Sequence, residues 1–260
     1  MTKYIFDDNQ SDAELRRMRL IESALDVQTC HLLEQTGVAT GWKCLEVGAG
    51  GGSILRWLGN RVGVTGRVVG VDKNTAYLKS FAAPPYEILD GNVLTVRGSG
   101  GFDLIHARYV LIHNRDAADI LAHLKNLLNP GGHLVLEEPD FEAAEWIDSR
   151  YGAAGNRVNH ATCAMFRGLS LDPGYGKRMP MAVSQMGLSL ARVDARSHLE
   201  NGTRPVAAMM AASTMALRDK YTATGEASDA DVVHYIDGAL DPASWSNYYS
   251  TVGIIATAAR

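Results

Sequence analysis

The residues best suited to chemistry lie between Lys43 and Asp72. A short apolar run there ends in a glycine cluster, 48–52, a helix-like segment follows, and a second apolar run ends at Asp72. Glycines adopt backbone angles closed to other residues and place no Cβ between the backbone and a ligand. A carboxylate at the end of the second strand can accept hydrogen bonds from both hydroxyls of a ribose. This order of strand, glycine turn, helix, strand and acid is typical of the first half of a nucleotide-binding βαβ unit.

The register inside this turn favours S-adenosylmethionine over a dinucleotide. A pyrophosphate fingerprint needs a third glycine, three residues after the second, to pack the helix on the strand. Ser53 occupies that position here, after Gly48 and Gly50. Glu46, two residues before the first glycine, is awkward beside a diphosphate but suits a ligand with a positively charged amino group. Another nucleotide-binding Rossmann domain is the alternative interpretation of this segment.

The segment resembles motif I of class I S-adenosylmethionine-dependent methyltransferases. Three further segments continue the resemblance, so that it covers about Lys43 to Glu138: Asn92-Val93 after the third strand, FDLIHAR at 102–108, and the LLNPGGHL turn at 127–134. A finer resemblance, to actinobacterial-type natural-product methyltransferases, is carried by Tyr4-Ile5-Phe6-Asp7, His106-Ala107-Arg108 and Glu137-Glu138.

The resemblance implies roles for individual cofactor-binding residues. Gly48, Ala49 and Gly50 would form the turn beneath the cofactor, and Asp72 would bind its ribose. Glu46 would meet the methionine amino group, directly or through water. Asn92, or alternatively Asp90, would face the adenine amine, and the backbone N–H of Val93 an adenine nitrogen. Lys73 would border the adenosine or remain a solvated lysine. Ala107 and Arg108 close the fourth strand, where Arg108 would pair with the methionine carboxylate or with a nearby glutamate.

Two residues are candidates for the catalytic side. His113 precedes a helix on the cofactor side, and an imidazole is a base suited to neutral pH; a structural role is the alternative. Glu138 ends the fifth strand, and ligands bind outside the carboxyl ends of strands in open α/β sheets. His106 lies within a strand, so we expect a hydrogen-bonded core histidine. We expect no metal, because metal-dependent relatives place an aspartate after strand four, where this chain has Arg108.

The repeated order of strand and helix predicts an α/β fold. We expect a Rossmann-like, doubly wound, mostly parallel seven-stranded sheet with an N-terminal helical cover and a helical insertion between strands five and six. One domain would then span residues 1–260. Its parts would be a helical lid at 1–41, a cofactor-binding core at 42–139, a substrate-side insertion at 140–188 and the C-terminal part of the sheet at 189–260.

Composition narrows the function class. A net charge of −4 gives no electrostatic reason to expect nucleic acid. Three cysteines without a CxxC pair indicate free thiols in a reducing compartment. We expect neither a signal peptide nor a membrane span. The interpretation is a cytoplasmic enzyme with a small-molecule substrate and no nucleic-acid or membrane partner. A homodimer is left open.

The predicted function is transfer of a methyl group from S-adenosylmethionine to a small organic acceptor, a secondary metabolite, by in-line displacement. The acceptor would lie under a lid made by residues 1–41 and 140–188. The alternative keeps the fold and changes the chemistry: an enzyme of methyltransferase fold that binds the cofactor but catalyses a cyclisation or rearrangement.

Overall fold

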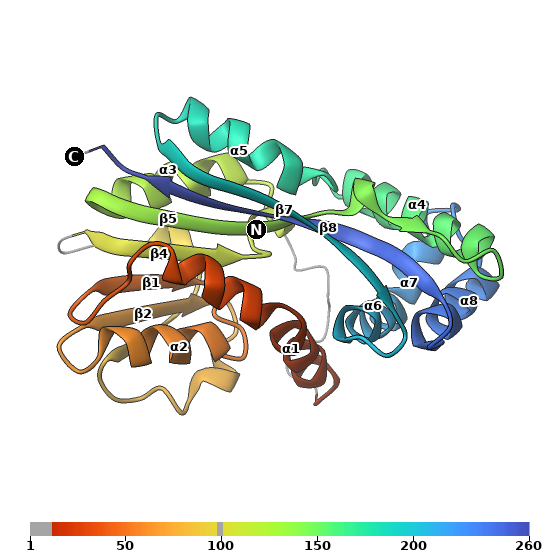
Figure 1. The fold of residues 1–260 in the computed structure, drawn as a ribbon, viewed down its shortest axis with the longest axis horizontal. Coiled ribbons are helices and arrows are strands. Elements are labelled where there is room, and N and C mark those ends of the chain that lie inside the picture. The colour runs from red at the N-terminus through yellow and green to blue at the C-terminus, as the bar shows by residue number, and fades with distance from the viewer. Residues whose placement is uncertain (1–11, 98–100, 260) are drawn as a thin grey trace.

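The computed structural model describes residues 12–97 and 101–259. Its centre is a mixed sheet of eight strands in the order β3-β2-β1-β4-β5-β8-β6, with β7 also paired to β8 (Figure 1). The strands are β1 (Lys43–Val47), β2 (Arg67–Asp72), β3 (Tyr86–Asp90), β4 (Phe102–Arg108), β5 (Leu128–Asp140), β6 (Glu145–Trp146), β7 (Ser189–Asn201) and β8 (Trp245–Thr257). The first five are parallel, whereas β8 runs antiparallel to β5, and β6 and β7 run antiparallel to β8.

The predicted Rossmann-like sheet is confirmed. The structure has eight strands where the sequence predicted seven, and the extra one is the two-residue β6. Two residues carry too little periodicity to predict a strand. β7 and β8, of 13 residues each, run past the carboxyl ends of the parallel strands (Figure 1). Residues Tyr4–Asp7, which carry part of the finer resemblance, lie outside the described residues.

Helices cover both faces of the sheet. One face carries α1 (Asp12–Glu34) and α2 (Ser53–Val62), and the other carries α3 (Ala117–Leu127) and α5 (Tyr175–Gln185). Strands β1 and β2 are buried over most of their length and rich in valine and leucine, as parallel strands covered on both faces should be. Two apolar layers result, and they fix the carboxyl ends of β1, β2 and β4 side by side.

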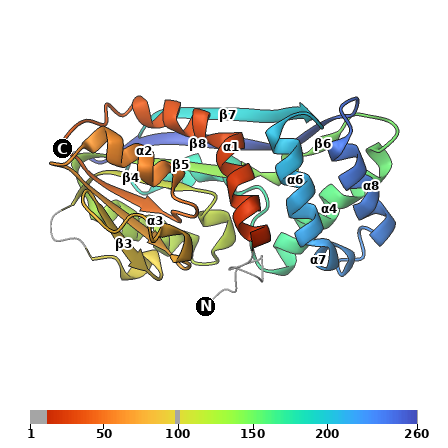
Figure 2. The ribbon, with the colours of Figure 1, turned by 90° about the horizontal axis from the view of Figure 1, so that it is seen from below.

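A helical cap stands beyond the carboxyl ends of the parallel strands (Figures 1 and 2). It consists of α4 (Gly152–Gly168), α6 (Pro205–Ala216), α7 (Arg218–Thr222) and α8 (Asp229–Leu240), and α1 packs against α6. The cap has its own apolar core. The predicted insertion contributes only α4, because α5 packs on the sheet. Residues 205–240, expected to belong to the C-terminal part of the sheet, form most of the cap instead.

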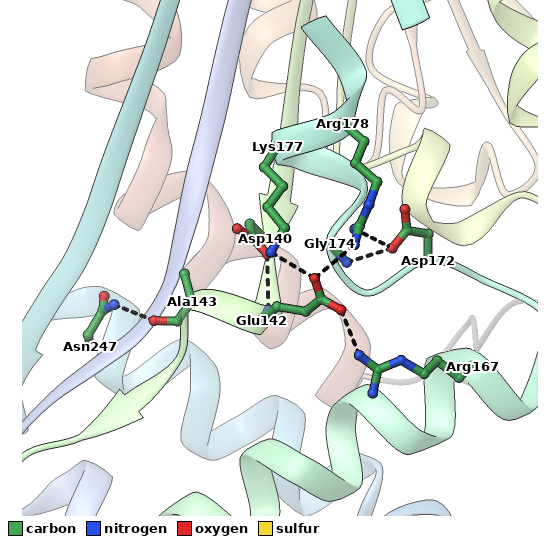
Figure 3. Close-up of polar contacts among 9 residues, drawn as sticks. All are labelled: Asp140, Glu142, Ala143, Arg167, Asp172, Gly174, Lys177, Arg178 and Asn247. Carbon is green, nitrogen blue, oxygen red and sulfur yellow. Dashed lines mark hydrogen bonds and ion pairs between the residues drawn. The ribbon is translucent and has the colours of Figure 1, made fainter. Parts of the chain in front are cut away.

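An ion-pair cluster fastens α4 and α5 to the short 3-10 helix η4 (Phe141–Ala143) after β5 (Figure 3). The carboxylate of Glu142 accepts hydrogen bonds or ion pairs from Arg167 at 2.6 Å, Lys177 at 2.7 Å and Arg178 at 3.1 Å. These partners, Lys177 foremost, lower the pKa of Glu142 to about 2. Asp140 also pairs with Lys177. The acids at the end of β5, Asp140 and Glu142, therefore pair with basic side chains of the same chain.

Candidate active site

The glycine turn after β1 has the backbone that its sequence predicts. Gly48, Gly50 and Gly52 have φ angles of 69°, 54° and 88°, which favour glycine. A Cβ on Gly48 would lie 2.6 Å from a side-chain carbon of Val110, so this turn also lacks room for a side chain. The turn leaves its backbone open to a ligand at the end of β1.

Asp72 closes one side of this turn. Its carboxylate accepts hydrogen bonds from the backbone N–H groups of Gly50, at 2.8 Å, and Asn74, at 2.9 Å. Burial raises the pKa of Asp72 above its usual value, although these N–H groups oppose the shift. The carboxylate is thus held in one orientation, with lone pairs left for a ligand.

A cavity of about 280 Å³ opens at the turn and continues beneath the cap. Nine of the ten predicted cofactor-binding residues line it: Glu46, Gly48, Ala49, Gly50, Asp72, Lys73, Asn92, Val93 and Arg108. Ala107 does not, because it is fully buried in the core layer between β4 and its neighbours. Asn92 also begins the 3-10 helix η2 (Val93–Thr95), where its side-chain oxygen accepts the N–H of Leu94 at 3.0 Å.

The far end of the cavity is largely apolar, although Glu14, Arg17, Thr162 and Ser213, from the same elements, also line the cavity. Its lining comes from α1, η4, α4, α6, α7 and β8, and includes Ile21, Phe141, Phe166, Met209, Met210, Leu217, Tyr221 and Tyr249. No local motif in the sequence predicts a role for these residues. One pattern pointed to α6: residues 205–216 carry no charge and are apolar all round, which is typical of a buried helix.

A buried charged network lies directly under the turn. His106 is fully buried, with Nδ1 2.7 Å from a carboxylate oxygen of Glu46 and Nε2 3.3 Å from one of Glu137. Burial favours the neutral ring, but the two carboxylates outweigh it and raise the pKa of His106 to about 9. His106 is therefore the hydrogen-bonded core histidine that its strand position predicts, and it is positively charged at neutral pH.

Arg108 joins the sheet to α1. Its guanidinium donates to Asp26 at 3.0 Å and to the hydroxyl of Thr29 at 2.8 Å. Asp26 of α1 is therefore its hydrogen-bonded ion-pair partner, and the nearby carboxylates of Glu137 and Asp26 raise the pKa of Arg108 above its usual value against the effect of burial. Since Arg108 also lines the cavity, it brings positive charge to the wall beneath α1.

The structure separates the two residues predicted to flank the acceptor. Glu138 has no exposed surface and does not line the cavity. Its carboxylate accepts the backbone N–H groups of Val110, Leu111 and Ile112 at 3.0, 2.7 and 3.2 Å. It therefore holds the loop after β4 in place, and the expectation that it faces the acceptor is wrong. Burial raises its pKa to about 8.

His113 does line the cavity, at the end of the 3-10 helix η3 (Leu111–His113). Its ring stacks on Phe166, with centroids 6.0 Å apart. Burial, reinforced by Arg17 and Lys73, lowers the pKa of His113 to about 3. The imidazole is neutral at pH 7, and its low basicity is poorly matched to proton abstraction at that pH.

Two further structural findings concern membrane-spanning helices and metal sites. Within residues 12–97 and 101–259, no helix is long and apolar enough to span a bilayer. In the same part of the chain, no group of three histidine, cysteine, aspartate or glutamate side chains is arranged to hold a metal ion.

Comparison with known proteins identifies the class of protein to which this fold and site belong. The family described as "Methyltransferase domain" matches residues 13–172. An uncharacterised 37.1 kDa protein in a transposon of Streptomyces fradiae is 31% identical over 161 residues, which is 55% of this chain and 46% of that protein. Several other curated relatives are named as methyltransferases. The chain spans about half the length, or less, of the curated relatives it matches.

Solved structures share the fold at low sequence identity. N-methyltransferase NodS from Bradyrhizobium japonicum, in complex with S-adenosyl-L-homocysteine, has a TM-score of 0.52 and 11% identity, covering 100% of both chains. The [4+2]-cyclase SpnF has a TM-score of 0.57 and 17% identity, covering 99% of this chain and 86% of that one.

The sheet, the glycine turn and the acid at the end of β2 define a class I nucleoside-binding methyltransferase fold. The chain belongs to the family described as "Methyltransferase domain". The site fits S-adenosylmethionine, since Asp72 is already oriented beside the glycine turn and the charged side chains of Glu46 and Arg108 line the same cavity.

Proposed function

We propose that this enzyme methylates a small, largely apolar organic acceptor, a secondary metabolite, in the cytoplasm. The observation that supports this is the continuity of the cavity, which runs from the glycine turn to an apolar chamber under the cap. Pockets for small ligands are typically concave and apolar, with a few placed polar groups. A chamber roofed by helices suits a small molecule better than a macromolecule.

In this proposal, each part of the cofactor contacts a different set of residues. S-adenosylmethionine supplies an electrophilic methyl group on a sulfonium centre. Asp72 accepts the ribose hydroxyls, Asn92 and Val93 border the adenine, and Lys73 lies beside the adenosine. Glu46 accepts the methionine amino group on the carboxylate oxygen not used by His106. Arg108 attracts the methionine carboxylate while Asp26 and Thr29 hold it.

The residues around the acceptor contribute mainly by aligning it with the methyl group of the cofactor. In-line displacement needs the nucleophile, methyl carbon and leaving group in one line, and water kept out. The apolar side chains of the chamber exclude water. Neutral His113, stacked on Phe166, orients the acceptor as a hydrogen-bonding group. An acceptor atom that is nucleophilic without losing a proton fits this site best.

A second candidate function is cyclisation or rearrangement of a bound metabolite without methyl transfer. The observation that favours it is again the low pKa of His113, because a poor base suits a reaction that needs no proton removed. Both functions require the same cofactor end.

The experiment that separates these functions uses S-adenosylmethionine labelled with ¹³C in its methyl group. The purified protein is incubated with a library of aromatic and polyketide-type metabolites, and products are read by mass spectrometry. We expect products heavier by one labelled methyl group, with stoichiometric formation of S-adenosylhomocysteine. Products of unchanged mass but altered retention, with cofactor unconsumed, would support the second function. Calorimetry showing tight binding of NAD and none of S-adenosylhomocysteine would refute both.

A further inference from the structure

One edge of the sheet is open along a long strand. β7 pairs with β8 on one side, and no strand of the described residues pairs with its other side. In Figure 2 this strand lies along the upper margin of the molecule. A free edge presents backbone N–H and C=O groups that can pair with a further strand, and natural proteins rarely leave a long one uncovered.

Two irregularities limit the part of β7 on which a further strand can pair. The register of β7 against β8 shifts between Leu190 and Arg192, and again between Ser197 and Leu199. Between these points residues 192–197 pair with residues 250–255 of β8 without a shift. Bulges interrupt pairing and twist an edge away from a partner. The regular segment 192–197 is therefore the part of the edge suited to a second strand.

The backbone directions in β8 follow from its hydrogen bonds to β5. Ala258 donates its N–H to the carbonyl of Gly132 at 3.0 Å, and the register between β5 and β8 is unbroken from there to Ser250. Backbone groups point to alternate sides along a strand, and opposite residues of an antiparallel pair share the same state. The even-numbered residues of β8 from 250 to 256 therefore face β5, and the odd-numbered residues between them face β7.

The same alternation decides which backbone groups of β7 point to the open edge. The odd-numbered residues 251, 253 and 255 of β8 lie opposite Arg196, Asp194 and Arg192. The N–H and C=O groups of these three residues therefore pair with β8. Those of the residues at 193, 195 and 197 point away from β8, to the open edge, and the side chains of all three are exposed.

We propose that a second copy of this chain covers this edge, and that the two copies pair antiparallel through residues 193–197 about a twofold axis at Ala195. Ala195 then lies opposite the partner's Ala195, and Val193 lies opposite the partner's Ser197. Each of these pairs exchanges two N–H···O hydrogen bonds. Every backbone group that the segment 193–197 directs to the open edge is thereby satisfied.

The charged side chains are complementary in this register. Asp194 and Arg196 share one face of β7, because they are two residues apart. About an axis at Ala195, Asp194 of each copy lies opposite the partner's Arg196, at a position between hydrogen-bonded pairs, where opposing side chains come closest. Arg192 pairs with Asp194 along the strand. Asp194 would then lie between two cations, one from each copy.

The two other registers that match the free backbone groups fit less well. An axis at Val193 carries the pairing into the irregularity between Leu190 and Arg192. An axis at Ser197 places Asp194 opposite the partner's Glu200, and like charges directly opposite each other are destabilising. Backbone direction, regular register and charge therefore select the same axis, at residue 195.

This contact closes on itself, because each copy uses the same edge, and a twofold contact of this kind gives a dimer rather than a fibre. The described lining of the cavity includes no residue of β7, so each copy keeps its own site and the inference does not depend on the proposed function. A ladder this short is at the small end of interface sizes, which is typical of weak complexes. We expect the dimer to dissociate on dilution.

Sedimentation velocity on the full chain tests the association. As the concentration rises from about 1 to about 200 µM, the weight-average mass of the wild type should rise from 28.1 kDa towards twice that value. Ala195→Pro removes an N–H that points to the open edge and none that pairs with β8, so it should remain monomeric. An unchanged melting temperature in circular dichroism shows that this variant keeps the fold.

Charge exchange tests the contact without a proline. Arg196→Asp should raise the dissociation constant about tenfold or more, because two attractive cross-strand pairs become repulsive. Adding Asp194→Arg should restore the dimer, since opposite charges again face each other. The matched control is Arg67→Asp, which makes the same change of charge at an exposed position on β2 and should leave the dissociation constant unchanged.

A cysteine at the axis tests the register. The Cα atoms of a hydrogen-bonded antiparallel pair lie about 5.5 Å apart, within the range that a disulfide spans. Mild oxidation should therefore convert Ala195→Cys into a covalent dimer. Ala191→Cys is the matched control, since residue 191 is also exposed on β7 but its two copies would be about 26 Å apart at about 3.3 Å per residue. It should remain uncrosslinked, and it accounts for the three cysteines of the natural chain.

A wild type that stays monomeric over the whole concentration range would overturn the inference. A dimer that persists in both Ala195→Pro and Arg196→Asp would also overturn it, because another surface would then hold the copies together. Equal crosslinking of the two cysteine variants would refute the axis at Ala195.

Discussion

Replacing His106 by leucine tests how strongly the charged network under the glycine turn stabilises the fold. The side chain is fully buried, and its two carboxylate partners, Glu46 and Glu137, are only 4% and 6% exposed. Removing the cation leaves Glu46 without this partner in a site that water hardly reaches, while Glu137 keeps the nearby Arg108 and Thr29. Breaking a buried ion pair in this way typically costs about 3–5 kcal/mol. We therefore expect His106→Leu to lose that much unfolding free energy.

The assay is urea unfolding followed by circular dichroism at pH 7, with the free-energy change taken from the midpoint at constant slope. Arg67→Leu is the control, because it removes the cation of the pair Arg67–Glu87, whose side chains are 46% and 40% exposed. That variant should lose at most about 1 kcal/mol, as exposed pairs do. A loss below 1 kcal/mol in His106→Leu would refute the reasoning, because the carboxylates would then be solvated or already protonated.

The remaining predictions concern pH, the turn and the loop after β4. The pKa of His106 is raised from 6.5 to about 9 in the folded protein, so its contribution to stability is complete below pH 6.5 and is lost as the pH rises through 9. The double variant His106→Asn, Glu46→Gln should therefore show a flatter decline of unfolding free energy over pH 6.5–9 than the wild type. Identical slopes in the two proteins would contradict this. Asp72→Ala should weaken S-adenosylhomocysteine binding by about 1.5–3 kcal/mol in calorimetry, the scale of hydrogen bonds to a charged group, while unchanged affinity would place the ribose elsewhere. Gly48→Ala should weaken that binding, because its Cβ would lie 2.6 Å from a side-chain carbon of Val110 and displace the loop after β4, whereas Gly37→Ala, with a similar φ of 77° and open space around it, should bind normally. Equal effects in both variants would mean that strain alone matters. Glu138→Gln should lower the unfolding free energy by about 1–3 kcal/mol, since an amide cannot accept the three N–H groups as well, and a stable variant with lost turnover would restore a catalytic role for Glu138.

Local sequence determined the cofactor end of this protein. Gly48, Gly50 and Asp72 lie within one βαβ unit, and the geometry of such a unit follows from the conformational freedom of glycine and from strand periodicity. For the same reason a histidine inside the buried strand β4 could be predicted to be hydrogen-bonded. Nine of the ten residues predicted for the cofactor line the cavity, and the exception, Ala107, belongs to the alternate face of its strand.

Only the tertiary structure decided the acceptor end. Glu138 was predicted to face the acceptor from its strand end alone, but the loop after β4 turns its N–H groups onto that carboxylate. Neither the low pKa of His113 nor the partner of Arg108 has a local sequence signature, because each depends on elements packed from elsewhere in the chain. The cap joins α1 and α4 to residues 205–240, and Tyr249 meets Tyr109 across 140 residues of sequence. Contacts of that separation arise from the packing of whole elements, and no local pattern specifies them.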